Sequence, residues 1–425
     1  MLKKLALHHV GPAADLTLGP VAPRFNLIAG DNGLGKSFLL EAAWWALTRT
    51  WHETMAVPSR PDASINYSYD GHKSLHTDSA KWNPRGQAWV RKTGRPPNPG
   101  LVIYARVDGS FSTWDPARNY RLYQRADGGD QESPAAYQFT SRQVMEGLTR
   151  TVVEAGSPRT QVLCAGLIDD WTRWQDSRDP RFELLTELLA RLGPDAPLRP
   201  GQPMRPTLDD QRRIPTILMP YGQEVPLTYC PAGVKRMCKL AYLLAWTFSE
   251  HQAEAERISQ PLSRQVIVLI DEPETHLHPR WQRTVLPSLV DAIGRWHADH
   301  APAVQAIVAT HSPLILASME SIFDTASDAL WKLDLVDGKV GIGKDVWTPR
   351  GDVNRWLTSD VFDLPAPTSR ATEDALEIAR HLMNDAAPDP GAVRQADERL
   401  AALLPQMDPF FIRWRHYMKA HLGTR

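Results

Sequence analysis

The stretch that decides the fold reads Gly30-Asp31-Asn32-Gly33-Leu34-Gly35-Lys36-Ser37. An apolar run, Phe25 to Ile28, precedes it, and an apolar, helix-favouring segment, Phe38 to Leu47, follows it. The order is therefore strand, glycine-rich turn and helix. The turn matches G-x-x-x-x-G-K-[ST], in which backbone N–H groups and the helix N-terminus bind the phosphates of a nucleotide. We expect Lys36 to reach the β- and γ-phosphates and the Ser37 hydroxyl to bind Mg²⁺.

Length and composition limit the classes of protein that fit. The chain has 425 residues, a formal net charge of -1 and 23% charged residues, so no global charge excess favours nucleic acid. Its 3 cysteines stand at no metal-ligand spacing, which argues against a disulfide framework or a zinc site. Residues 1–5 lack the apolar core of a signal peptide, and no apolar run approaches the ~20 residues of a membrane span. We therefore expect a cytoplasmic protein with no membrane partner.

A second set of motifs lies far along the chain. Residues 266–270 are five aliphatic residues followed by Asp271 and Glu272, the pattern of a parallel strand buried on both faces. Ligands bind at the carboxyl ends of such strands, so we expect Asp271 to hold the Mg²⁺ shell through water and Glu272 to polarise the attacking water. A further aliphatic strand, 303–309, ends before Thr310-His311-Ser312-Pro313, and His311 is placed to contact the γ-phosphate.

Two stretches combine basic and aromatic residues. Residues 81–95 hold five basic residues and no acid, with Trp82 and Trp89 among them, and residues 413–419 repeat the combination. Cations that neutralise phosphates beside rings that stack on bases are typical of a DNA or RNA contact. A solvated loop with packed tryptophans explains the first stretch as well, so both interpretations stay open.

The remaining segments are predicted from periodicity and proline content. The aliphatic run 101–105 predicts a buried strand, and helical spacing predicts helices within 137–193, over 233–250 and in two or three pieces over 372–422. The 35 prolines cluster in 58–99 and 194–231, which predicts irregular connections there.

These motifs, in this order, resemble those of ABC-class ATPases of the RecF/SMC/OLD type, and in particular the stand-alone ATPases of bacterial anti-phage systems such as Septu. The resemblance rests on residues 30–37, on the string Asp271-Glu272-Pro273-Glu274-Thr275-His276-Leu277-His278-Pro279 and on residues 310–313. It implies an α/β fold: a P-loop NTPase with an ABC-type ATPase head, an inserted mostly helical lid and a helical C-terminal tail. The expected parts are the N-terminal part of the head with the phosphate loop at 1–50, the lid at 51–225, the C-terminal part of the head with signature, Walker B and His switch at 226–350, and the tail at 351–425.

The resemblance also implies an activity and partners. Heads of this group dimerise head to tail and hold two ATP molecules between one subunit's phosphate loop and the other's signature motif. The implied site has Lys36, Glu272 and His311 as catalytic residues, Ser37 and Asp271 at Mg²⁺, and nucleotide contacts from residues 30–37, Phe38, Ala232 and Gly233. The implied partners are further copies of the head, as a homodimer or higher oligomer, and a separate effector such as an HNH-type nuclease in anti-phage defence.

The sequence departs from the group's pattern in the signature. Pro231 stands where such ATPases commonly carry a serine, and proline offers neither a hydroxyl nor an N–H to a phosphate. A slowly hydrolysing scaffold that restrains a nuclease is therefore an alternative, and a RecF-like DNA repair ATPase that uses Arg91 and Lys92 is a second. His278 replaces the aspartate of transporter ATPases, which makes a transporter subunit the weakest of the alternatives. The glutamine of the Mg²⁺ shell has four candidates: Gln87, Gln124, Gln138 and Gln143.

The tail does not match a built-in nuclease. OLD-type proteins carry a Toprim nuclease domain after the ATPase, and that domain needs an Asp-x-Asp pair at a strand end. Asp334-Leu335-Val336-Asp337 has the wrong spacing for it. We expect any DNA cutting to come from a partner protein.

Overall fold

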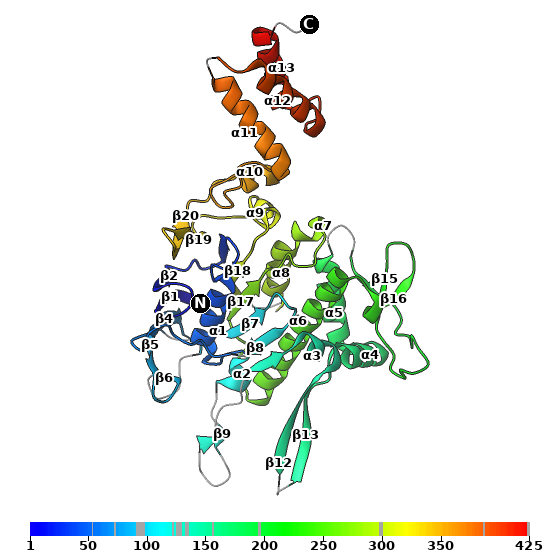
Figure 1. The fold of residues 1–425 in the computed structure, drawn as a ribbon. Helices are drawn as coiled ribbons and strands as arrows, with labels where there is room; N and C mark the ends of the chain where they lie inside the picture. Colours follow the sequence, from blue (N-terminus) through cyan, green and yellow to red (C-terminus); the bar gives the residue numbers. More distant parts are fainter. Residues whose placement is uncertain are drawn as a thin grey trace. The chain divides into compact units, whose positions relative to one another are not determined.

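The computed structural model describes most of the chain, in two units. The described residues are 1–52, 54–71, 74–90, 98–120, 123–124, 130–131, 136–154, 157–193, 197–296, 301–385 and 387–422. The first unit is Met1–Gly351 and the second is Asp352–Arg425 (Figure 1). Among the described residues, no helix combines the length and the apolarity needed to cross a membrane.

An eight-stranded sheet forms the centre of the first unit, in the order β11-β8-β7-β17-β18-β3-β19-β20 (Figure 1). Its parallel strands are β7 (Leu101–Ala105), β17 (Gln265–Asp271), β18 (Ala303–Ala309), β3 (Phe25–Gly30) and β19 (Ala329–Val336). Antiparallel pairing adds β8 (Phe111–Trp114) and β11 (Tyr137–Phe139) at one edge and β20 (Lys339–Asp345) at the other. The carboxyl ends of β17, β18 and β3 therefore lie side by side, although their sequences are far apart.

One face of this sheet packs against a buried helix. Helix α1 (Lys36–Thr48) is apolar nearly all round, which is the composition of a helix covered on every side. It shares one hydrophobic core with alternate residues of the central strands, such as Ile267 and Leu269, and with a second, antiparallel sheet. That sheet has the order β2-β1-β4-β5-β6 and consists of β1 (Leu2–His8), β2 (Asp15–Leu18), β4 (Ser64–Asp70), β5 (Leu75–Asn83) and β6 (Ala88–Val90).

Helices cover the other face. The longest, α6 (Ala232–Arg257), sets Trp246 edge-on against the rings of Tyr137 and Phe139 on β11. It packs against α5 (Pro180–Leu192), which also contacts α8 (Val285–Gly294). The remaining elements of this unit are α2 (Pro116–Asn119), α3 (Ser141–Glu146), α4 (Leu167–Ser177), α7 (Pro279–Gln282), α9 (Pro313–Met319), η1 (Leu227–Tyr229), β9 (Tyr123–Gln124), β10 (Asp130–Gln131), β12 (Leu148–Glu154), β13 (Ser157–Cys164), β14 (Arg199–Pro200), β15 (Thr216–Leu218) and β16 (Glu224–Pro226).

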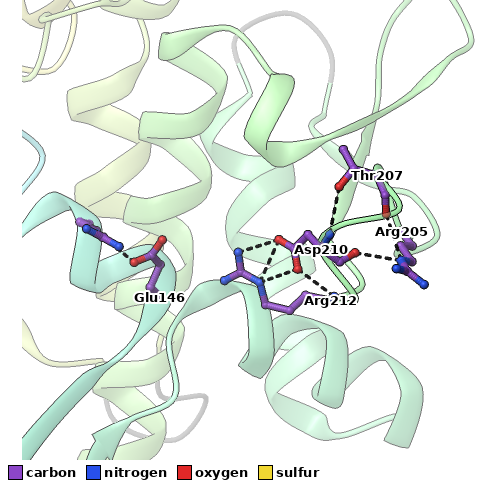
Figure 2. A network of polar contacts seen from close by, with 6 residues as sticks. Glu146, Arg205, Thr207, Asp210 and Arg212 are labelled. Atoms are coloured by element: carbon purple, nitrogen blue, oxygen red, sulfur yellow. Dashed lines mark hydrogen bonds and ion pairs between the residues drawn. The ribbon is translucent and has the colours of Figure 1, made fainter.

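A polar network shapes the proline-rich loop between β14 and β15 (Figure 2). The Arg205 side chain donates to the carbonyl oxygens of Thr207 and Asp210, while the Asp210 N–H donates to the Thr207 hydroxyl at 3.2 Å. The Arg212 guanidinium pairs with the Asp210 carboxylate at 2.8 Å, and this hydrogen bond lowers the pKa of Asp210 to about 2. The negative charge of Glu146, on α3, favours the charged state of Arg212 from the other side. The loop that leads towards α6 is thus held by its own side chains.

The α/β fold with a phosphate loop and a helical C-terminal segment is confirmed, and the middle of the chain differs from the prediction. Residues 51–225 contain the helices α2 to α5, but they also supply strands to both large sheets. Strand β4 shows the reason, because buried Ile65, Tyr67 and Tyr69 alternate with residues outside the core. That period of two marks a half-buried antiparallel strand, and it was hidden within the proline-rich interval.

The second unit is helical, as predicted. It consists of α10 (Val353–Leu357), α11 (Arg370–Asn384), α12 (Pro390–Leu403) and α13 (Pro409–Leu422). Trp414 lies in its hydrophobic core and donates from Nε1 to Asp397 at 3.0 Å, and the Tyr417 hydroxyl donates to the Leu382 carbonyl at 2.8 Å. The rings of Trp414 and Tyr417 are thus packed within this unit, which favours a structural role for them over stacking on bases.

The tryptophans of the first basic-aromatic stretch, residues 81–95, are also packed within the fold. Trp89 is buried and donates from Nε1 to the Ala56 carbonyl at 2.9 Å, with the Trp82 ring edge-on at 5.3 Å. The interpretation as packed tryptophans holds for these two rings. Arg91, Lys92 and Arg95 lie outside the described residues.

Candidate nucleotide-binding site

The phosphate loop, residues 30–37, joins β3 to α1 and depends on its glycines. Gly30 and Gly35 have φ of 139° and 96°, in the left-handed region. A Cβ on Gly30 would lie 2.4 Å from the Leu333 carbonyl oxygen, and a Cβ on Gly35 would lie 2.6 Å from Cγ of Pro12. Helix α1 begins without a side-chain cap and with no acid in its first turn. Its first N–H groups are therefore available to an anion.

The Lys36 side chain folds back over this loop. Its Nζ donates to the carbonyl oxygens of Gly30 at 2.7 Å and Asp31 at 2.8 Å, and only 4% of the residue is exposed. Burial lowers the pKa of the Lys36 ammonium to about 8, although the charges of Glu272 and Asp271 oppose the change. The Lys36 ammonium donates only to neutral carbonyl oxygens here, and a bound polyphosphate would favour its charged form.

Ser37 and Asp271 meet where the predicted magnesium site should be. The Ser37 side chain lies close enough to the Asp271 carboxylate, at the end of β17, to favour its charged form, but burial outweighs this effect and raises the pKa of Asp271 to about 6. Within the described part of the chain, one oxygen of this carboxylate, Oδ1, is buried with no hydrogen-bond partner. A hydroxyl beside a buried, unsatisfied carboxylate oxygen is a donor set that suits Mg²⁺, so the residues fit this ion.

Glu272 and His311 face each other across the ends of β17 and β18. His311 Nε2 lies 3.3 Å from Glu272 Oε1, and the Thr275 hydroxyl donates to Glu272 Oε2 at 3.1 Å. Glu272 has φ of 46°, a left-handed conformation that is uncommon outside glycine. Burial lowers the pKa of His311, and the positive charge of Lys36 lowers it further against the charge of Glu272, which favours the neutral imidazole. The structure thus brings together Lys36, Ser37, Asp271, Glu272 and His311, all predicted from sequence.

Two further residues position these groups, and sequence reasoning gave them no role. Glu274 accepts from the Thr310 hydroxyl at 2.8 Å and from the His311 N–H at 2.7 Å, which fixes the backbone that carries the imidazole. Arg236, on α6, donates to the carbonyl oxygens of Glu272 at 2.9 Å and Val107 at 2.7 Å. The only signals in the sequence were the place of Glu274 in the acidic string and of Arg236 on a basic helix face.

The loop after β7 borders the site and carries a buried arginine. Arg106 Nε donates to Glu41 of α1 at 2.9 Å, and Nη1 donates to the Ser112 hydroxyl at 2.9 Å. The Glu41 charge also acts on Asp271. Arg106 therefore links α1, the helix of the phosphate loop, to β8, another contact that the sequence did not reveal.

The glutamine expected in the magnesium shell is not identified. Three of the four candidates bond elsewhere: Gln87 to the Pro84 carbonyl, Gln138 to the Trp51 carbonyl, and Gln143 in the N-terminal capping box of α3. The side chain of Gln124 lies outside the described residues.

The remaining predicted contacts lie at the start of two helices. Phe38, on α1, packs against Gly11, where an added Cβ would come within 2.4 Å of its ring. Pro231 is the N-cap of α6 and provides no side-chain cap, and Ala232 begins the helix on the surface. A Cβ on Gly233 would lie 2.9 Å from the carbonyl oxygen of His276, so the helix start packs against the loop that follows Glu272.

Sequence comparisons cover parts of the chain. Residues 178–317 match the family described as "AAA domain, putative AbiEii toxin, Type IV TA system", a range that includes α6, β17 and β18. The chain is 41% identical over 64 residues to the "Retron Vc95 probable ATPase" of Vibrio cholerae serotype O1 biovar El Tor, which is 15% of this chain and 11% of that protein. It is 32% identical over 104 residues to the "Retron Ec83 probable ATPase" of Escherichia coli, 24% of this chain and 16% of that protein. The chain thus spans less than a fifth of the length of these curated relatives.

Two solved structures show more distant likenesses. The SMC head domain from Thermotoga maritima is 16% identical, with 81% of this chain and 99% of that chain covered and a TM-score of 0.38. The recombination mediator protein RecF-ATPrS is 12% identical, with 81% of this chain and 98% of that chain covered and a TM-score of 0.39. Scores this low do not by themselves establish a common fold.

Proposed function

We propose that this chain is a cytoplasmic, Mg²⁺-dependent ATPase of the ABC type. The observation that carries the proposal is the meeting of Ser37 with the buried Asp271 carboxylate, beside the Glu272 and His311 pair. Residues 1–50 and 226–350 would supply the catalytic groups of the head, 51–225 further strands and helices, and 351–425 the tail. The family match and the two retron relatives support an ATPase.

The side chains divide the work of hydrolysis among them. Lys36, held over the loop by two carbonyl oxygens, would turn to the β- and γ-phosphates and absorb charge as the terminal bond breaks. Glu272 would orient the attacking water for in-line displacement, with its carboxylate fixed by Thr275, and neutral His311 would contact the γ-phosphate. When bound between Ser37 and Asp271, Mg²⁺ would neutralise phosphate oxygens.

Phosphate release from purified protein tests the proposal. Glu272→Gln should lower the turnover number at least 100-fold and leave ATP binding by calorimetry within about threefold, because the change removes the water-orienting carboxylate and no phosphate contact. Glu187→Gln, on the exposed side of α5, is the matched control and should behave as wild type. Wild-type turnover in Glu272→Gln would contradict the proposed role.

We also infer that ATP drives dimerisation of heads and so controls a separate effector, such as a nuclease, or senses nucleic acid, in anti-phage defence. The exposed start of α6 at Ala232 supports this, since a helix N-terminus on the surface can meet a phosphate held by a second copy. The retron names of the relatives favour defence. Light scattering of Glu272→Gln with MgATP should show a dimer. Adding Ala232→Glu should abolish the dimer by charge repulsion, whereas Ala232→Ser should retain it.

A slowly hydrolysing scaffold is the second candidate, and Pro231 favours it. This N-cap gives α6 no side-chain hydrogen bond and offers a partner-bound phosphate no donor. Pro231→Ser introduces the hydroxyl and the backbone N–H that proline lacks. It should raise turnover at least tenfold if the missing hydroxyl limits hydrolysis. If the wild-type chain already turns over rapidly and the variant does not exceed it, the scaffold alternative fails.

A further inference from the structure

A group of potential metal ligands lies where β1 ends and the β1–β2 turn begins. His8, His9 and Asp62 each offer one ligand atom, and these atoms lie within 4.8 Å of one another. None of the three belongs to the nucleotide site, and no role was assigned to them from the sequence.

The backbone is shaped to put the two imidazoles on the same side. Consecutive residues of a strand point to opposite faces, so neighbouring histidines do not normally meet. Here His9 has φ of 52°, in the left-handed region, directly after β1 ends, and the two ring centroids lie only 4.0 Å apart. A non-glycine residue in this conformation is held there by its surroundings and is a reason to look for a function.

Those surroundings are well defined. The His9 N–H donates to the Ala14 carbonyl at 2.6 Å, and the His9 carbonyl accepts from the Ser59 N–H at 3.0 Å and the Ser59 hydroxyl at 3.2 Å. Val10 forms a bridge to Pro58, so the turn that carries Asp62 is tied to the end of β1. The ligand atoms therefore come from two segments that the backbone already joins.

A fourth residue completes the arrangement. Asp15 pairs with His8 across the β1–β2 ladder, and its Oδ1 lies 2.6 Å from His8 Nδ1. With Nδ1–H donating to this carboxylate, Nε2 is left with its lone pair free to bind a cation. A carboxylate behind a metal-binding histidine is the usual way in which proteins fix the tautomer and ring orientation of such a ligand.

We propose that His8, His9 and Asp62 bind a borderline transition-metal dication, Zn²⁺, with Asp15 orienting His8. Two imidazole nitrogens and one carboxylate oxygen suit this ion, and a water completes four-coordination. Ligand atoms within 4.8 Å need only small side-chain rotations to converge on bonds of about 2.0–2.2 Å.

A metal at this site would restrain the turn that packs against the phosphate loop. Pro12, in the same turn as the histidines, lies against Gly35, and Gly11 lies against the ring of Phe38. A metal that joins residues 8 and 9 to residue 62 would restrain this turn. The proposal does not depend on ATP hydrolysis.

Metal binding by the full chain tests the proposal. After dialysis against Zn²⁺ with excess Mg²⁺ and no nucleotide, elemental analysis should find one zinc per chain. The double variant His8→Ala, His9→Ala should lose it, and Asp62→Asn should bind at least tenfold more weakly. Asp15→Asn should weaken binding about 10- to 100-fold, as expected for a residue behind the ligand. His381→Ala, an exposed histidine of the second unit, is the matched control and should bind as wild type.

Co²⁺ provides a readout that is independent of affinity. It should give the intense visible absorption of a four-coordinate site in wild type, in Asp271→Asn and in His381→Ala, and not in the double histidine variant. Asp62 is exposed in a turn, so Asp62→Asn should fold normally. Its weaker metal binding can therefore be measured even if the double histidine variant does not fold. A chain that takes up no zinc, or that binds it equally in the histidine and Asp62 variants, would overturn the proposal.

Discussion

Replacing Asp271 with asparagine should stabilise the nucleotide-free protein. In the folded chain, burial raises the pKa of this carboxyl from 3.8 to about 6. At about 1.4 kcal/mol per pH unit, the ionised carboxylate costs the folded state about 3 kcal/mol at pH 8. Asparagine carries no charge and has nearly the same shape, so most of this cost should disappear. We expect the free energy of unfolding to rise by about 1–3 kcal/mol at pH 8.

The sign follows from proton linkage. Because the pKa is higher in the folded chain than in the unfolded chain, the folded chain holds the proton more tightly, and the wild type gains stability as the pH falls through 6 towards 3.8. At pH 5 this gain is about 1.4 kcal/mol, and the variant has no such gain. The difference between Asp271→Asn and wild type should therefore narrow by that amount between pH 8 and pH 5.

Chemical denaturation without and with MgATP would measure both effects. The relevant transition is the one that MgATP shifts, since the chain has two units. MgATP should stabilise Asp271→Asn less than wild type, because a ligand of the ion is lost. Asp108→Asn is a matched control: burial acts to raise the pKa of Asp108, but hydrogen bonds from Ser110 outweigh it and the pKa is lowered, so this change should destabilise. The reasoning is refuted if Asp271→Asn is no more stable than wild type at pH 8, or if the difference does not change with pH.

Three other substitutions probe separate features. Arg236→Met removes donors to the carbonyls of Glu272 and Val107, so the turnover number should fall about tenfold while the KM for ATP stays within about twofold, as steady-state phosphate release would show. Gly35→Ala places a Cβ 2.6 Å from Pro12 at a φ of 96° and should weaken ATP binding at least tenfold by calorimetry, whereas Gly222→Ala, at a similar φ of 84° but facing open space, should not. Trp414→Ala empties a fully buried site and should destabilise the second unit by about 3–5 kcal/mol, seen as faster hydrogen exchange across α11 to α13.

The parallel strands were predictable and the antiparallel sheet was not. Strands β7 and β18 have the predicted bounds, and β17 begins one residue earlier than predicted, because strands buried on both faces read as continuous aliphatic runs. Strands β4 and β5 expose one face, so polar residues interrupt the apolar ones, and the proline-rich surroundings suggested irregular structure. The signal for these strands is the alternation of buried and exposed residues, which can be recognised as a strand only once the neighbouring strand of the sheet is known.

The residues of the nucleotide site also fall into those that the sequence predicts and those that it does not. Lys36, Asp271 and Glu272 follow from local order along the chain, since each stands at the end of a strand or in the turn after one. Arg236 does not, because its hydrogen bond to Val107 spans 129 residues and exists only once α6 lies beside the loop after β7. Residues that act through such long-range contacts form no motif of fixed spacing, so the sequence alone does not identify them.

The sheet order has a consequence for how the protein is made. Strand β3, which delivers the phosphate loop, lies between β18 and β19, and both of these neighbours are encoded beyond residue 300. During translation, β3 must leave the ribosome with both edges unpaired and wait for most of the chain to be synthesised. An unpaired hydrophobic strand that persists this long is prone to aggregation, so production in cells should respond to chaperone supply and to slower translation.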